Sequence, residues 1–320
     1  MTYSKSQKVI GRIDGDSKDV ACFHQVIKYI DLANEKITLA KGQKGFVFLG
    51  SAIDEGVKRN QGRVGAAKAP QAMRQAMASF PVHFDEEIVL FDGGNIEIEN
   101  GDLEKAQVEI GSYIAKILAA NCTPILLGGG HDITYSNHLG VKDFAGNKKV
   151  GIINVDAHFD LRPIDPTIGG SSGASIYKIA SEARKNGEHF SCLALGIQKY
   201  GNTKLLFNLA KEFGVDYALG DDFSYANKEN LLKKVEEFIA KNELIYLTIC
   251  MNVFSACYAP GVSAPAANGI APDEVFKSVF DLIINSKKLI SLDFAEINPD
   301  FDVDLRTAKL AASLIFRAIR

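Results

Sequence analysis

Short unbroken runs of apolar residues recur along the chain, separated by longer stretches with helical periodicity. A continuous apolar run is typical of a strand covered on both faces, whereas a strand with one wet face alternates apolar and polar residues. We therefore predict strands at Gly45–Leu49, Glu87–Phe91, Pro124–Leu127, Val150–Val155, Cys192–Ile197, Ile245–Ile249 and Leu289–Phe294.

The stretches between these runs place apolar residues three and four positions apart, which is the spacing of one helix face. Strands that alternate with helices in this way form a parallel sheet with helices on both faces. No repeat or low-complexity linker interrupts the alternation, so we expect a single domain over residues 1–320. About the first 40 residues are less regular, and there we expect a strand and a helix packed on the sheet edge. The predicted helices are Ala69–Ala78, Leu103–Ala120, Ala174–Asn186, Thr203–Phe213, Glu229–Lys241, Pro272–Ile284 and Leu305–Ile319.

The composition narrows the choice of partner and compartment. The net charge of −3 gives no electrostatic footprint for nucleic acid. No apolar run approaches the roughly 20 residues of a membrane-spanning helix, and the N-terminus carries no apolar signal segment. The five cysteines are odd in number and widely spaced, as in reduced cytoplasmic proteins. We therefore expect a cytoplasmic protein that acts on a small molecule and binds neither nucleic acid nor membrane.

Potential metal ligands follow two of the predicted strands. Asp156, His158 and Asp160 stand two residues apart after the fourth strand, and side chains with this spacing share one face of an extended segment. His131 follows the third strand. Carboxylates and imidazoles bind divalent ions, and ligands of parallel sheets lie beyond the carboxyl ends of the strands, so the pattern predicts a metal site there. The remaining histidines lack such company and are expected to be packing or surface residues: His24, His83, His138 and His189.

Ordered segments along the chain carry the motifs of one protein superfamily. They are Asn60–Ala67, Leu126–Asp132, Asp156–Arg162, Ser171–Gly173, Leu195–Gln198, Ala259–Pro265, Glu296–Pro299 and Arg306–Ala308. Together they resemble the arginase superfamily, the ureohydrolases, and most closely its formimidoylglutamase branch. The resemblance implies a three-layer α/β/α sandwich with a mainly parallel sheet, assembled as trimers or hexamers. It also implies a binuclear Mn²⁺ site that hydrolyses an amidine or guanidine C–N bond. In this branch, N-formimidoyl-L-glutamate yields L-glutamate and formamide.

The metal ligands that the resemblance implies are His131, Asp156, His158, Asp160, Cys250 and Asn252. The last two depart from the family pattern, which has Asp-x-Asp where this chain has Cys250-Met251-Asn252. A thiolate favours Zn²⁺ or Fe²⁺ over Mn²⁺, and the neutral amide of Asn252 is a poor Mn²⁺ ligand. We therefore expect one position formed by His131, Asp156, Asp160 and Cys250, and a second that is empty or weak. Inert packing of Cys250 remains an alternative, because buried cysteines often behave as small hydrophobes.

The resemblance also implies roles for the substrate side of the site. Asp160 would orient the attacking water and protonate the leaving amine, and Glu296 would hold the cationic amidine. Arg162, with Ser172 beside it, would bind a substrate carboxylate, for which a planar guanidinium is well suited. The intact substrate side favours a working hydrolase. The changes at positions 250 and 252 favour a catalytically impaired relative that binds a small ligand or a partner subunit. Arginase or agmatinase activity fits less well, because Ala174-Ser175-Ile176 lacks the His that arginases carry there.

Overall fold

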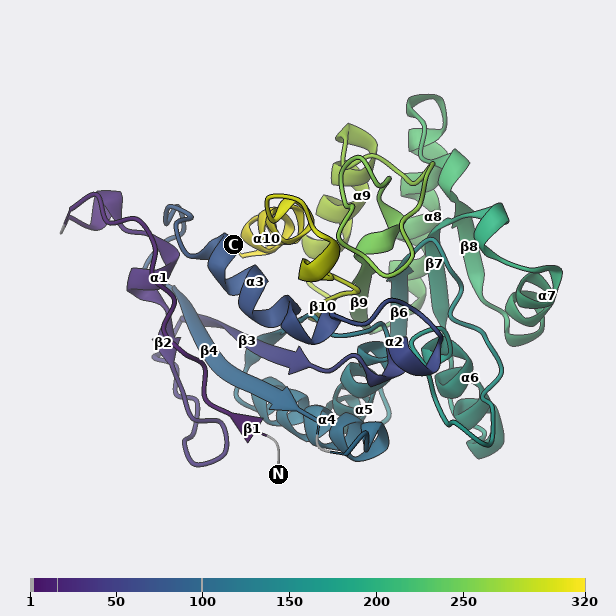
Figure 1. Cartoon of the computed structure of the whole chain (residues 1–320), viewed down its shortest axis with the longest axis horizontal. Helices are drawn as coiled ribbons and strands as arrows, with labels where there is room; N and C mark the ends of the chain where they lie inside the picture. The colour runs from purple at the N-terminus through teal and green to yellow at the C-terminus, as the bar shows by residue number, and fades with distance from the viewer. Residues whose placement is uncertain (1–2, 16, 99, 320) are drawn as a thin grey trace.

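A ten-stranded sheet runs through the centre of the molecule (Figure 1). The computed structural model describes residues 3–15, 17–98 and 100–319. The strand order is β1-β4-β3-β5-β10-β9-β6-β7-β8, with β2 also paired to β4, and all pairs except β1–β4 are parallel. The strands are β1 Tyr3–Ser4, β2 Lys28–Tyr29, β3 Lys44–Ala52, β4 Ile88–Glu97, β5 Cys122–Leu127, β6 Val150–Val155, β7 Cys192–Ile197, β8 Asp216–Leu219, β9 Leu244–Cys250 and β10 Leu289–Ala295. All seven predicted strands are present, and the mainly parallel α/β sheet confirms the expected fold class.

Helices cover both faces of this sheet and form two hydrophobic cores. One face packs against α3 (Ala69–Met77), α8 (Lys228–Lys241), α9 (Glu274–Ile284) and α10 (Arg306–Ala318). The other packs against α4 (Leu103–Ala119), α5 (Ile133–Ala145), α6 (Ser175–Asn186) and α7 (Lys204–Phe213). The central strands are buried on both faces, as their continuous apolar sequences predict. In the described residues, no helix combines the length and apolar character needed to cross a membrane.

Local signals set the helix ends. The side chain of Asp273 accepts hydrogen bonds from the backbone N–H groups of Val275 and Phe276 at 2.9 and 3.2 Å, which fixes the start of α9. Gly187 and Gly214 follow α6 and α7 in the left-handed conformation that ends many helices. These caps explain why the predicted helices agree closely with the observed ones.

Beyond the N-terminal region, the hydrophobic pattern missed three of the strands and α-helices: the short helix α2 (Glu55–Arg59), α5 and the edge strand β8. Helix α5 buries Thr134, Ser136 and Asn137, so its buried face does not stand out as apolar. In the N-terminal region, β1 and β2 pair with β4, and a single-turn helix, α1 (Phe23–Val26), lies beside them. The expected strand and helix at this edge are therefore two short strands and one helical turn.

Candidate metal centre

The candidate ligands gather at the carboxyl ends of four neighbouring strands. His131 follows β5, Asp156 to Asp160 follow β6, Cys250 ends β9, and Glu296 comes directly after β10. These strands lie in the order β5-β10-β9-β6, so the loops that follow them meet over the middle of the sheet. Asp160 and Glu296 both adopt the left-handed conformation, with φ of 51° and 67°. Such strain is costly for residues other than glycine and is often found at functional sites.

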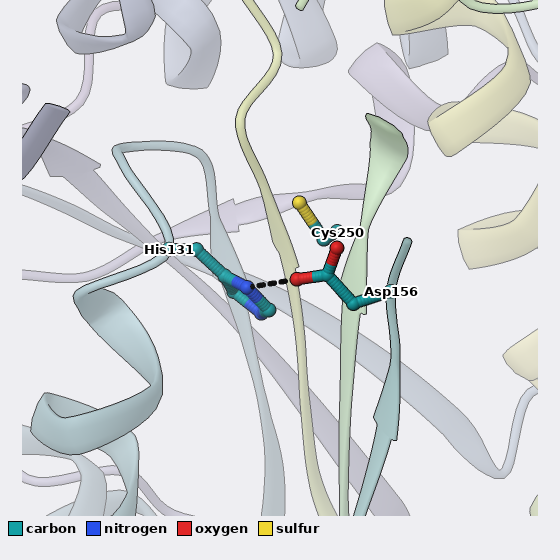
Figure 2. Close-up of side chains that lie close together, drawn as sticks. All are labelled: His131, Asp156 and Cys250. Carbon is teal, nitrogen blue, oxygen red and sulfur yellow. Dashed lines mark ion pairs between the residues drawn. The ribbon is translucent and has the colours of Figure 1, made fainter. Parts of the chain in front are cut away.

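The first metal position is formed by atoms that converge without bonding one another well. His131 Nδ1 lies 2.7 Å from Asp156 Oδ2 and 2.7 Å from Asp160 Oδ2. All three atoms are buried and have no aligned hydrogen-bond partner among the described residues. Cys250 joins His131 and Asp156 in a trio whose ligand atoms all lie within 4.8 Å of one another (Figure 2). Buried nitrogen and oxygen atoms that converge on one place without an aligned hydrogen bond fit a divalent cation, which would displace the proton of His131 and offset the desolvation of the carboxylates.

The charges of this position depend on one another. Burial alone would lower the pKa of His131, but Cys250, Asp160 and Asp156 together raise it well above its usual value. Burial, with Asp156 adding to it, raises the pKa of the Cys250 thiol well above its own usual value. A thiol that keeps its proton carries no charge and cannot stabilise a positive charge on His131. At neutral pH the protonated form of His131 is therefore stabilised by the carboxylates of Asp156 and Asp160. Ligation by Cys250 therefore requires an incoming cation to displace the thiol proton.

The second metal position is filled by contacts among its own residues. Asp156 Oδ1 accepts a hydrogen bond from the backbone N–H of His158 at 2.9 Å. Asn252 Nδ2 lies 3.3 Å from His158 Nδ1 and donates to it when the ring is neutral. A second cation would have to displace this contact and accept an amide oxygen in place of a carboxylate. His158 Nδ1 also lies 3.3 Å from Asp156 Oδ1, and Asn252 Oδ1 is buried without a hydrogen-bond partner among the described residues.

One wall of the site is held by an arginine clamp. Arg63 donates from Nε to the carbonyl of Ser263 at 3.0 Å and from Nη2 to the carbonyl of Val262. Asn298 Nδ2 donates in turn to the Arg63 carbonyl at 2.9 Å. Gly65 has a φ of 135°, and a Cβ there would lie 2.3 Å from Asn298 Oδ1, so this position requires glycine. The motif residue Arg63 thus supports the pocket wall with its guanidinium.

A cavity of about 300 Å³ leads from the metal position to Arg162. Arg162 is exposed on its rim and forms no ion pair with any described residue, so its guanidinium is available to an anion. Ser172 is buried in the cavity wall, where its backbone N–H donates to the carbonyl of Gly56 at 3.0 Å. Glu296 closes the inner end, and its Oε1 accepts the backbone N–H of His131 at 3.0 Å. Burial raises the pKa of Glu296 to about 7 against the opposing effect of that hydrogen bond.

The comparisons with known proteins agree with this geometry. A model of the arginase family matches residues 44–320. The chain belongs to the arginase family. Among arginase-family proteins, formimidoylglutamase from Clostridium tetani (strain Massachusetts / E88) is 40% identical over 314 residues, covering 97% of this chain and 92% of that protein. Formimidoylglutamase from Fusobacterium nucleatum subsp. nucleatum is 37% identical, covering 97% of this chain and 96% of that protein.

Solved structures of the arginase family share the fold. Trypanosoma cruzi formiminoglutamase with Mn²⁺ superposes with a TM-score of 0.77 at 22% identity, covering 91% of this chain and 97% of that one. Formimidoylglutamase from Bacillus subtilis superposes with a TM-score of 0.76 at 22% identity, covering 96% and 94%. At this level of identity, the likeness concerns the fold alone.

The structure adds two residues to those predicted. Thr248 lies two positions before Cys250 on β9, and its Oγ1 lies 2.9 Å from His131 Nε2. The alternation of side chains along a strand puts residues 248 and 250 on one face, which is a signal that the sequence did contain. Asn60 lines the cavity beside Arg162: a Cβ at Gly173 would lie 3.1 Å from Asn60 Oδ1 and 3.2 Å from Arg162 Nε. The predicted site residues all line this one cavity: His131, Asp156, His158, Asp160, Arg162, Ser172, Cys250, Asn252 and Glu296.

Proposed function

We propose that this chain hydrolyses N-formimidoyl-L-glutamate to L-glutamate and formamide, with one divalent ion held by His131, Asp156, Asp160 and Cys250. The observation that carries the proposal is the set of unpartnered ligand atoms at one end of a cavity that has a free guanidinium at the other. The relatives that share most of their length with this chain bear the name of this activity. Oxygen from water enters the formamide, and the broken C–N bond leaves its electron pair on the amino nitrogen of glutamate.

The metal would be a different one from that of the Mn²⁺-containing structural neighbour. A divalent ion held there would lower the pKa of a bound water, so that hydroxide, a stronger nucleophile than water, would be available at neutral pH. With Cys250 in the ligand set, we expect Zn²⁺ or Fe²⁺ to bind more tightly than Mn²⁺. The Asn252–His158 contact supports a single ion.

The residues around this position would transfer the proton and bind the two ends of the substrate. Asp160, whose pKa is raised by burial and by Asp156, can accept the proton of the attacking water and pass it to the leaving nitrogen. Glu296 faces the cationic amidine at the buried end of the cavity, where a positive charge restores its ionised form. Arg162 at the rim binds a carboxylate of the glutamate moiety. Assembly as trimers or hexamers stays a prediction, which sedimentation velocity would check.

The direct test is formamide release by metal-free protein reloaded with Zn²⁺, Fe²⁺ under argon, or Mn²⁺. We expect release from N-formimidoyl-L-glutamate, none from arginine or agmatine, and one tightly bound ion per chain by elemental analysis. An impaired relative remains the second candidate, favoured by the same Asn252–His158 contact. It becomes the better reading if the reloaded protein binds the substrate by calorimetry but releases no formamide with any of the three ions.

Arg162 tests the substrate side separately. Arg162→Ala should lower kcat/KM by roughly 5- to 30-fold, because an exposed charge-assisted contact contributes about 1–2 kcal/mol. Arg162→Lys is the matched control and should recover part of the loss, since it keeps the charge without the two-pronged geometry. Metal content should stay at the wild-type value in both variants. Unchanged kinetics in Arg162→Ala would remove this residue from the substrate site.

A further inference from the structure

A row of buried polar side chains lies next to the metal position, on two strands of the sheet and on α5. Figure 1 shows where these elements lie in the fold. The members of the row sit on two neighbouring strands and the helix, and each has no exposed surface: Thr134, Asn137, Tyr246, Thr248, Ser291 and Asp293. In the sheet register, Asp293 of β10 pairs with Thr248 of β9. Buried polar groups are costly unless they are satisfied, so this row requires a reason.

The donors of the row converge on the carboxylate of Asp293. Thr248 Oγ1 donates to Asp293 Oδ1 at 2.6 Å. Asn137 Nδ2 donates to Asp293 Oδ2 at 2.9 Å, and the hydroxyl of Tyr246 donates to the same oxygen. Ser291 Oγ donates to Asn137 Oδ1 at 2.7 Å, which orients the amide with its N–H toward Asp293. The contacts made by Asp293 are therefore all to donors, as an ionised carboxylate requires.

The number of protons available in this row of hydrogen bonds determines the orientation of the His131 ring. A hydroxyl has one proton, and Thr248 donates its proton to Asp293. Thr248 Oγ1 can then only accept from His131 Nε2, 2.9 Å away. The ring must carry a hydrogen on Nε2, which leaves Nδ1 directed toward Asp156 and Asp160 at 2.7 Å. The arrangement is that of a histidine whose outer nitrogen is held so that the inner one can bind a metal.

We propose that Asp293, acting through Thr248, is a positioning residue that holds the His131 ring with Nδ1 presented to the metal position. This inference rests on the proposed metal-dependent function. It assigns a purpose to the polar residues of α5, because Asn137 orients Asp293 from the helix side. A His131 ring that is fixed before the ion arrives would favour metal binding at a site that lacks two family carboxylates.

The test compares three single variants of buried hydroxyls with wild type. Thr248→Val removes the hydroxyl that links Asp293 to His131 while keeping the shape of the side chain. Thr248→Ser keeps the hydroxyl. Thr134→Val is the matched control, because Thr134 Oγ1 lies 3.2 Å from Thr248 Oγ1 but forms no hydrogen bond with the side chain of His131 or Asp293 among the described residues. Zn²⁺ affinity is measured by competition with a chromophoric chelator, and the ring orientation of His131 from crystals of each metal-free protein.

We expect Thr248→Val to bind Zn²⁺ about 10- to 100-fold more weakly, the range typical when a ligand's supporting partner is removed. Thr248→Ser and Thr134→Val should match wild type, and only Thr248→Val should show a turned His131 ring. Equal weakening in Thr248→Val and Thr134→Val would overturn the proposal, because any lost hydroxyl would then suffice. Wild-type affinity in Thr248→Val would overturn it while leaving the proposed function intact. If wild type bound no metal, the proposed function would fail. The positioning role is tested independently of metal binding, because an unturned His131 ring in metal-free Thr248→Val would overturn it.

Discussion

The two metal positions share Asp156 but differ in what their other atoms do. At the first, His131 Nδ1 lies 2.7 Å from the Oδ2 atoms of Asp156 and Asp160 in ion pairs that lack an aligned hydrogen bond. At the second, the amide of Asn252 is hydrogen-bonded to the imidazole of His158. The first position offers converging atoms to a cation. At the second, a cation would have to displace the Asn252–His158 contact, although Asn252 Oδ1 is buried without a hydrogen-bond partner among the described residues.

This difference shows that the effect of a lost ligand depends on what replaces it. Asn252 can donate a hydrogen bond to His158 when the ring is neutral, so that this half of the site is closed by a contact between its own side chains. The sulfur of Cys250 lies beside His131 and Asp156 (Figure 2). A thiol in that place still offers a ligand once its proton is displaced.

The strongest test of this asymmetry replaces one histidine from each position. His131→Ala should weaken Zn²⁺ binding by more than about 100-fold, beyond the range seen for supporting residues, and abolish formamide release. His158→Ala should keep one tightly bound ion, because His158 belongs to the closed half. Zn²⁺ at about 100 times its dissociation constant should stabilise wild type by about 2.7 kcal/mol, and this stabilisation should vanish in His131→Ala alone. Equal loss of binding in both variants would show that the positions act as one unit.

A smaller effect is expected from restoring the family carboxylates. Cys250→Asp with Asn252→Asp should create a second Mn²⁺ position, because an aspartate at 250 can bridge two ions and one at 252 frees the His158 ring. Elemental analysis should rise from one to two ions per chain, and Mn²⁺-dependent formamide release should increase. Each single variant should gain less, since a bridging carboxylate is useful only when both ions are held. If the double variant bound two ions yet hydrolysed no faster, the rest of the pocket would also have diverged.

The sequence predicted the parts of the molecule in which polarity and burial agree. The seven central strands are apolar and buried, and α9 begins where Asp273 caps it, so pattern and structure coincide. The gathering of His131, Asp156 and Cys250 was also predicted, because the carboxyl ends of parallel strands meet at one edge of the sheet.

The sequence failed where buried residues are polar. Helix α5 places Thr134 and Asn137 against the sheet because Thr248 and Asp293 offer them partners there. Such partners are distant in sequence, and periodicity carries no information about them. For the same reason Asp293 was counted as part of an apolar strand. The exposure of Arg162 could not be predicted either, since it depends on how the loop after β6 passes the rim of the cavity.

The last prediction uses a second histidine associated with α5 to separate burial from ligation. His138 was expected to be a packing or surface residue, and its Nδ1 is buried without a hydrogen-bond partner in the described part of the chain. Burial, with Lys142 nearby, lowers the pKa of His138 to about 4, whereas the carboxylates raise that of His131. Between about pH 4 and 6.5 the unfolded chain binds a proton at His138 that the folded chain does not, so this residue makes stability rise with pH.

His138→Gln should remove that contribution. Relative to the variant, wild type should lose up to about 3 kcal/mol of unfolding free energy as the pH falls from 6.5 to 4. The difference between the folded and unfolded pKa values sets this upper limit, and the partial exposure of His138 reduces the loss. Urea denaturation of both metal-free proteins at several pH values measures the difference between their unfolding free energies. The titration of all other groups cancels in this difference because both proteins share those groups. Zn²⁺ affinity should be the same in both. Parallel stability curves would mean that the His138 ring is hydrated in solution, and weakened Zn²⁺ binding would mean that α5 supports the metal position through more than its hydrogen bonds to Asp293 and Thr248.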